Sequence, residues 1–194
     1  MELKSILIMV FSYLIGCFNT GYYYIKLFYK EDIRKTGTKV TGAANVNRIA
    51  GRKGFIITFL GDTLKGVLVV VLCRIFHLSE MITLFCILFV LAGHIFPVQL
   101  HFHGGKGIST FMGTLLVFDP IFVVFLIISY AVIYPFVKRS TITSLFAFIL
   151  FPFELLLTGY HWKLILFACF YSIIILYACR SNMKDYLNKT SKNK

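Results

Sequence analysis

Residues 80–107 read EMITLFCILFVLAGHIFPVQLHFHGGKG, an apolar stretch that runs into a glycine-rich turn. The apolar part, residues 80–100, has the length of a membrane-crossing helix, which takes about 20 residues. A bilayer offers the backbone no hydrogen-bond partners, so a spanning segment is either a helix or a strand of a closed barrel. The alternating pattern of a barrel strand is missing here. The stretch therefore predicts a membrane helix followed by a polar turn.

Further apolar segments repeat this pattern along the chain. They cover residues 5–29, 54–76, 108–118, 119–137, 141–159 and 162–179. With 58% hydrophobic and 14% charged residues, the composition excludes an ordinary soluble domain. The sequence thus predicts an all-α fold, a polytopic membrane helical bundle of about seven transmembrane helices, some of them short or broken. We expect a single domain over residues 1–194, with a flexible tail at about 188–194.

Basic residues are distributed unevenly between the two sides that seven spans define. The loops of one side carry 15 of the 20 Lys and Arg residues; these loops are 30–53, 101–107, 138–140 and 180–194. The other side carries only Lys4, Arg74 and Lys163. Because cytoplasmic loops are enriched in basic residues, we expect the first set inside the cell, with the N-terminus outside and the C-terminus inside. The net charge of +12 also suits anionic lipid or an anionic substrate.

The first cytoplasmic loop combines glycines, hydroxyls, amides and an arginine. It includes Thr38, Asn45 and Arg48. A glycine-rich turn directs backbone N–H groups toward an anion, and arginine binds phosphate through two parallel hydrogen bonds. The pattern predicts a phosphate site, although a basic loop that touches lipid headgroups explains the composition equally well.

The second cytoplasmic loop ends in Gly104, Gly105, Lys106 and Gly107, directly before a predicted helix. Amides at a helix start and one lysine are suited to phosphate. The spacing is not that of a nucleotide-binding P-loop. His94 lies shortly before the loop, as a structural or a catalytic residue. The sequence predicts no metal, no cofactor and no nucleic-acid partner.

Asp62 and Lys65 lie within the second predicted span. At a spacing of three residues they share one helix face and can pair. Ionisable residues at membrane depth are candidates for function, but mutual neutralisation explains them nearly as well.

Taken together, these segments resemble the PlsY-type glycerol-3-phosphate acyltransferases of bacteria, over nearly the whole chain. The similar stretches are GHIFPVQLHFHGGKG at 93–107, DIRKTG at 32–37, GAANVNR at 42–48 and DTLKG at 62–66. The resemblance implies a bacterial cell membrane protein that transfers an acyl group from fatty acyl phosphate to the sn-1 hydroxyl of glycerol 3-phosphate. The product would be lysophosphatidic acid, the first intermediate of phospholipid synthesis. Membrane lipid, and an enzyme that produces the acyl phosphate, are the further partners it implies.

The resemblance also implies roles for individual residues. Thr38, Asn182 and His94 would be catalytic. The substrate phosphates would be bound by Arg48, Asn45, Gly104, Gly105, Lys106 and Gly107. Asp62 and Lys65 would support the site.

The chain departs from the family pattern at several positions. Thr38-Lys39-Val40 replaces Ser-Gly-Asn, Cys179 replaces a histidine, and Ser191 lies near the position of a glutamate. Cys17 and Asn19 replace a serine and a proline. Two alternatives therefore stay open beside the enzyme: a weak or inactive paralogue that binds phosphorylated lipid or a partner enzyme, and an anion transporter built on Asp62 and Lys65.

Overall fold

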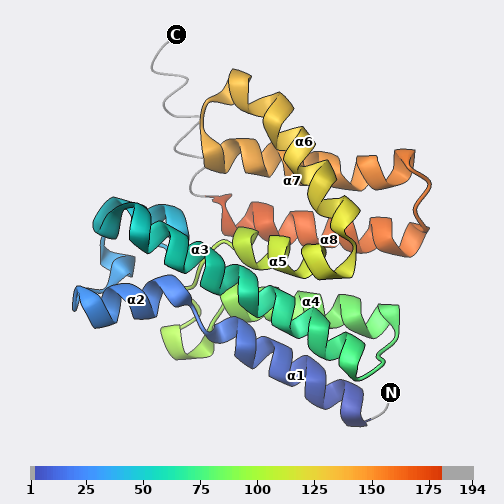
Figure 1. The fold of residues 1–194 in the computed structure, drawn as a ribbon, viewed down its shortest axis with the longest axis horizontal. Helices are drawn as coiled ribbons and strands as arrows, with labels where there is room; N and C mark the ends of the chain where they lie inside the picture. The colour runs from blue at the N-terminus through green and yellow to red at the C-terminus, as the bar shows by residue number, and fades with distance from the viewer. Residues whose placement is uncertain (1–2, 181–194) are drawn as a thin grey trace. The chain divides into compact units, whose positions relative to one another are not determined.

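The computed structural model describes residues 3–180, and the regular elements of this part are all helices. Asn182, Ser191 and the predicted tail lie outside the described residues. The chain divides between Phe118 and Asp119 into two compact units, both visible in Figure 1. Each unit is described in turn.

The first unit holds five α-helices and two short 3-10 helices. These are α1 (Leu3–Cys17), α2 (Thr20–Phe28), η1 (Ile33–Lys35), α3 (Ala43–Ile75), α4 (Glu80–Ile95), η2 (Val98–Leu100) and α5 (Ile108–Phe118). The main packing pairs are α1 with α4 and α3 with α5, and α2 packs against α3. Buried apolar side chains from α1, α3 and α4 form a common core; they include Met9, Val69, Cys73, Cys86 and Val90.

Two of the predicted boundaries differ from the structure. The first apolar run is not one helix, because the backbone leaves the helical region at Asn19, whose φ is −93° and ψ 100°. Helix α3 begins at Ala43 and not at residue 54, so part of the predicted loop is helical. Hydropathy misses this first part because Asn45, Asn47 and Arg48 interrupt its apolar residues. Within α3, Gly51 has φ 64° and ψ −165°, a conformation essentially restricted to glycine, and it separates the polar part from the apolar span.

Glycines bring the paired helices of the first unit into backbone contact. A β-carbon on Gly16 of α1 would overlap the backbone of Val90, and one on Gly93 of α4 would overlap that of Tyr13. The same holds between α3 and α5, where Gly66 faces the Thr110 carbonyl and Gly113 faces that of Thr63. Small residues of this kind let membrane helices pack closely. The second crossing fixes α5, the helix that follows the Gly104–Gly107 turn.

The second unit is a three-helix arrangement of α6 (Pro120–Val137), α7 (Ser140–Leu157) and α8 (Trp162–Ala178), in which α7 packs against both neighbours. Asp119 caps α6 by accepting a hydrogen bond from the Ile121 amide at 3.1 Å, as expected for a polar residue before a proline at a helix start. Its other carboxylate oxygen accepts from the Tyr160 hydroxyl at 3.0 Å. These contacts fix the start of α6 to the turn between α7 and α8.

Five segments of the described chain are long and apolar enough to cross a membrane. They are Leu3–Phe28, Ala43–Ile75, Glu80–Leu100, Pro120–Val137 and Ser140–Leu157. Helices α5 and α8 are apolar but shorter. These segments confirm the predicted all-α membrane bundle of about seven helices, some of them short or broken.

Candidate functional site

The two polar loops that the sequence singles out lie against each other in the first unit. The Thr41 amide, at the end of the first loop, donates to the Gly104 carbonyl of the second at 3.4 Å. A stronger connection comes from Arg34, whose Nη1 donates to the Leu100 carbonyl at 2.9 Å. The loops therefore form one polar region, although Arg34 and Leu100 are 66 residues apart in the sequence.

Asn45 organises the first loop from the start of α3. Its Nδ2 lies within 3.3 Å of the carbonyls of Ile33, Thr36 and Val40, and its Oδ1 accepts from the Thr38 amide at 2.9 Å. The side chain is only 1% exposed. All of its polar atoms are thus used by the loop itself, which makes Asn45 a support for the turn that presents Thr38.

An ion pair stabilises the other end of this loop. Arg34 binds both carboxylate oxygens of Asp32, with Nη2 to Oδ2 at 2.7 Å and Nε to Oδ1 at 2.9 Å. The hydrogen bonds from Arg34 lower the pKa of Asp32 to about 2 against the opposing effect of burial. Asp32 therefore stays ionised, and Arg34 keeps the orientation in which it reaches Leu100.

The backbone amides of Gly104 and Gly105 donate to the C-terminal end of α4. Gly104 donates to the Ile95 carbonyl at 3.1 Å and Gly105 to the His94 carbonyl at 3.0 Å. These two N–H groups are occupied by the chain, so the amide contacts predicted for Gly104 and Gly105 are not available in this conformation. Helix α5 begins at Ile108. As at every helix start, the N–H groups of its first turn have no carbonyl partner within the helix. An anion at this turn would meet those amides and the Lys106 side chain.

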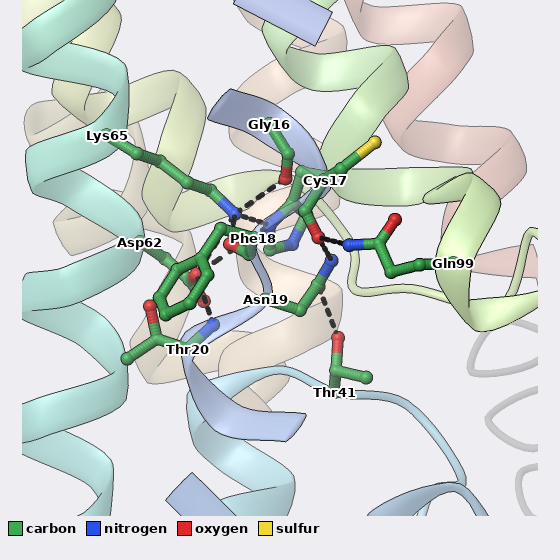
Figure 2. Close-up of polar contacts among 10 residues, drawn as sticks. Gly16, Cys17, Phe18, Asn19, Thr20, Thr41, Asp62, Lys65 and Gln99 are labelled. Carbon is green, nitrogen blue, oxygen red and sulfur yellow. Dashed lines mark hydrogen bonds and ion pairs between the residues drawn. The ribbon is translucent and has the colours of Figure 1, made fainter. Parts of the chain in front are cut away.

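A buried charged cluster lies between the break of the first span and helices α3 and α4 (Figure 2). Asp62 Oδ1 is 3.2 Å from Lys65 Nζ, so the predicted pairing is present. Lys65 also donates to the carbonyls of Gly16 at 3.0 Å and Phe18 at 2.7 Å, which are left open where α1 ends. His94 Nδ1 lies 2.7 Å from the same ammonium group. The cluster thus satisfies the broken helix end inside the bundle.

Asn19 connects this break to the polar loops, as Figure 2 shows. Its Nδ2 donates to the Cys17 carbonyl at 3.1 Å, and its Oδ1 accepts from the Thr41 hydroxyl at 2.6 Å. The Cys17 carbonyl also accepts from Gln99 Nε2 at 2.6 Å. Since Thr41 itself contacts Gly104, the first span, the first loop and the second loop form one hydrogen-bonded frame.

The remaining predicted site residues of the described chain lie in the two loops or at the helix starts that follow them. Arg48 is exposed on the short polar part of α3, with its aliphatic stem beside Gly37. Thr38 and Lys106 are partly buried, and Gly107 is buried at the start of α5. Asn182 belongs to the part of the chain that is not described. The structure therefore brings the two loops together and places His94, Asp62 and Lys65 behind them.

Sequence reasoning did not assign roles to Arg34, Gln99 and Asn19, although each connects separate segments. For Arg34 the carboxylate two residues earlier was a usable signal, because the pair fits a short polar turn. For Gln99 and Asn19 no local pattern points to the distant carbonyl or hydroxyl that each one meets.

The side chains and amides of the two loops are of the kinds that bind anions. Arg48, Thr38 and Lys106 lie on these loops or beside them, and the amides at the start of α5 follow the second loop directly. Such a set binds phosphate and stabilises developing negative charge.

Comparisons with known proteins identify the family of this chain. The profile of the family "Glycerol-3-phosphate acyltransferase" matches residues 6–189. The "Glycerol-3-phosphate acyltransferase 1" of Desulfitobacterium hafniense is 36% identical, over 94% of this chain and 91% of that protein. The "Glycerol-3-phosphate acyltransferase" of Alkaliphilus metalliredigens is 35% identical, over 97% and 95%.

Solved structures show the same fold. The crystal structure of PlsY (YgiH), an integral membrane glycerol 3-phosphate acyltransferase, in its glycerol 3-phosphate form superposes with a TM-score of 0.87. The sequence identity is 27%, and the match covers 96% of this chain and 93% of that one. The lysophosphatidic acid form superposes with a TM-score of 0.83. With the family profile over both units, relatives that align almost end to end and a shared membrane fold, the chain belongs to the glycerol-3-phosphate acyltransferase family of the PlsY type.

Proposed function

We propose that this membrane acyltransferase moves an acyl group from a fatty acyl phosphate to the sn-1 hydroxyl of glycerol 3-phosphate. The products are lysophosphatidic acid and inorganic phosphate. The observation that carries the proposal is the contact between the two polar loops, through Thr41 to Gly104 and Arg34 to Leu100. Both substrates carry phosphate, and both loops offer groups suited to phosphate on one side of the chain.

The donor chemistry fits the residues that are available. An acyl phosphate is a mixed anhydride with a good leaving group, so the protein mainly has to hold the reactants and stabilise charge. Arg48 and Lys106 bind the two phosphates, and the amides at the start of α5 and at Gly107 add neutral donors. The Thr38 hydroxyl and Asn182 contact the reacting groups. A substrate phosphate takes the proton of the attacking hydroxyl, in place of a protein base.

The sequence departures concern the first loop and the end of the chain more than the frame. Asn45 is fully engaged with the turn that contains Thr38, which supports a fixed hydroxyl at that place despite the changed neighbours Lys39 and Val40. Asp62 and Lys65 support the site indirectly. The two side chains pair, and Lys65 donates to a carbonyl at the end of α1. This use of the pair argues against a transport role for it.

Placement in the cell follows the basic residues. We propose that the motif loops and the C-terminus face the cytoplasm and the N-terminus faces outward. The exposed basic side chains of the first loop suit anionic lipid, and an enzyme that supplies acyl phosphate would dock there. Both units act as one domain, which is supported by the family profile that spans residues 6–189.

The test is an assay of the purified protein with glycerol 3-phosphate and palmitoyl phosphate, run beside palmitoyl-CoA. We expect lysophosphatidic acid from the acyl phosphate only. Lys106→Ala should lower kcat/KM by about 100-fold, the order of magnitude for one donor in a charge-stabilising site.

Lys53→Ala is the matched control, because Lys53 is an exposed lysine at the start of the apolar part of α3 and lies outside the proposed site. It should keep full activity. Equal turnover of Lys106→Ala and the unchanged protein would contradict the proposed site. Binding of glycerol 3-phosphate without any product would instead identify an inactive paralogue.

A further inference from the structure

His94 is almost completely buried, yet only one of its two ring nitrogens is used. The side chain is 3% exposed. Nδ1 lies 2.7 Å from Lys65 Nζ and 3.8 Å from Asp62 Oδ1. Nε2 has no hydrogen-bond partner among the described residues, and it is not one of the buried polar atoms that are sealed from solvent without a partner. Nε2 is therefore a polar atom of this buried side chain that no described residue binds.

The neighbours of Lys65 determine which nitrogen of His94 carries the hydrogen. An ammonium group has three N–H donors and no acceptor, so any group it contacts has to accept. Its other contacts are two carbonyls and, at 3.2 Å, the Asp62 carboxylate, which are acceptors and favour the charged amine. The three N–H groups are shared among these partners and His94. Nδ1 must then be the acceptor of the imidazole. A neutral ring with an accepting Nδ1 carries its hydrogen on Nε2.

Nε2 lies close to Gly105 of the glycine-rich turn. A β-carbon built on Gly105 would overlap Nε2 and Cε1 of the ring and would crowd Cδ2. The imidazole thus fills the space that a side chain at position 105 would need. The backbone amide of Gly105 donates to the His94 carbonyl at 3.0 Å. This hydrogen bond keeps the turn next to the imidazole.

We propose that His94 Nε2–H is a hydrogen-bond donor to an anionic substrate oxygen at the Gly104–Gly107 turn, and that Lys65 is the positioning residue that fixes this tautomer. The inference rests on the proposed function of the same turn. The oxygen belongs either to a phosphate or to the oxyanion of the reacting carbonyl. In both cases a neutral donor strengthens the anion site without adding charge beside Lys106.

Two amide variants test the proposal, because glutamine and asparagine replace different ring nitrogens. The longer side chain of His94→Gln places an N–H near the position of Nε2. The shorter one of His94→Asn reaches only the position of Nδ1, where its oxygen can still accept from Lys65. A purely structural His94 would make the asparagine variant the more stable and the more active of the two.

The donor role predicts opposite orders for stability and activity. Thermal unfolding in detergent should show His94→Asn at least as stable as His94→Gln. Its acyl-transfer activity should nevertheless be about 100-fold below that of the unchanged protein, the magnitude for a removed oxyanion donor. His94→Gln should keep at least about ten times more activity than His94→Asn. A loss in kcat identifies the oxyanion and a rise in KM for glycerol 3-phosphate identifies its phosphate; an asparagine variant as active as the glutamine variant overturns the proposal.

A spectroscopic measurement on the unchanged protein is independent of folding of the variants and of the acyl donor. Nitrogen NMR of the labelled histidine rings distinguishes the two neutral tautomers, and the His94 signals are those that His94→Asn lacks. We expect the Nε2–H tautomer, with an Nε2 signal that shifts on addition of glycerol 3-phosphate or inorganic phosphate. The Nδ1–H tautomer, a doubly protonated ring or an Nε2 signal that neither anion moves would overturn the inference, whether or not acyl transfer is observed.

Discussion

At the scale of single residues, Asn45 shows how a polar side chain can determine the shape of a site without touching a ligand. The sequence motif GAANVNR predicts a phosphate contact for this amide. In the structure its two ends join four backbone groups of the first loop. Gly37, which has φ 60°, lies so close that a β-carbon there would overlap Asn45 Oδ1. The glycine and the asparagine are therefore needed together.

Replacement of Asn45 should damage the first loop more than the fold. Asn45→Ala leaves buried backbone groups unpaired, at a cost of about 1–3 kcal/mol in the free energy of unfolding. Because the turn with Thr38 loses its support, we also expect KM for glycerol 3-phosphate to rise. Denaturant titration and steady-state kinetics measure the two effects.

Asn47→Ala is the natural control, since Asn47 lies on the same helical turn of α3 but is exposed. It should change neither stability nor KM appreciably. Equal effects of the two substitutions would show that the contacts of Asn45 do not hold the loop in place.

At the scale of helices, the crossing of α3 and α5 positions the turn that precedes α5. Gly66 and Gly113 allow the two backbones to touch, and no side-chain movement can relieve a β-carbon that meets a carbonyl. Gly66→Ala should therefore lower the free energy of unfolding by about 1–3 kcal/mol through overpacking, in spite of the higher helix propensity of alanine. It should also lower activity, because α5 and the Gly104–Gly107 turn shift together.

Gly61→Ala in the same helix is the control, because it changes helix propensity as Gly66→Ala does but does not place a β-carbon against another backbone. The atoms that a β-carbon at position 61 would overlap are Cγ2 and Oγ1 of Thr20, which side-chain rotation can move away. The loss of stability should be clearly smaller than for Gly66→Ala. If Gly61→Ala proves the more harmful of the two, close backbone contact is not what holds α5 in place.

At the scale of the whole molecule, the arrangement of charge predicts the orientation in the membrane. Lys35→Cys, in the first loop, should react with a membrane-impermeant thiol reagent only after the cells are permeabilised. Thr158→Cys, in the turn after α7, should react in intact cells, since this turn lies on the side with few basic residues. Labelling of Lys35→Cys from outside would reverse the proposed topology.

Hydropathy predicted the apolar segments well, because the requirement to satisfy the backbone in lipid leaves little choice of structure. The bounds of α5, for instance, agree with the predicted segment 108–118. The break at Asn19 was not predictable in this way. It lies inside an apolar run, and its open carbonyls are satisfied by Lys65, which is 47 residues away from Phe18.

For the site, motif spacing predicted which loops matter but not how their polar atoms are used. The amides of Gly104 and Gly105 could donate either to an anion or to the end of α4. They donate to α4 because the His94 and Ile95 carbonyls lie within reach. The same applies to Asn45. Sequence patterns indicate donors and acceptors, while their partners follow from the packing of distant segments.

Gly51 interrupts the regular backbone of α3 between its first turns and its membrane span. Nothing lies within 4 Å of the place where its side chain would be, so the glycine is required by its backbone angles alone. Gly51 joins the apolar part of α3 to the short part that carries Asn45 and Arg48. Because long apolar helices tilt when the surrounding bilayer becomes thinner, we expect α3 to tilt by rotation about Gly51, with Arg48 staying at the depth of the headgroups.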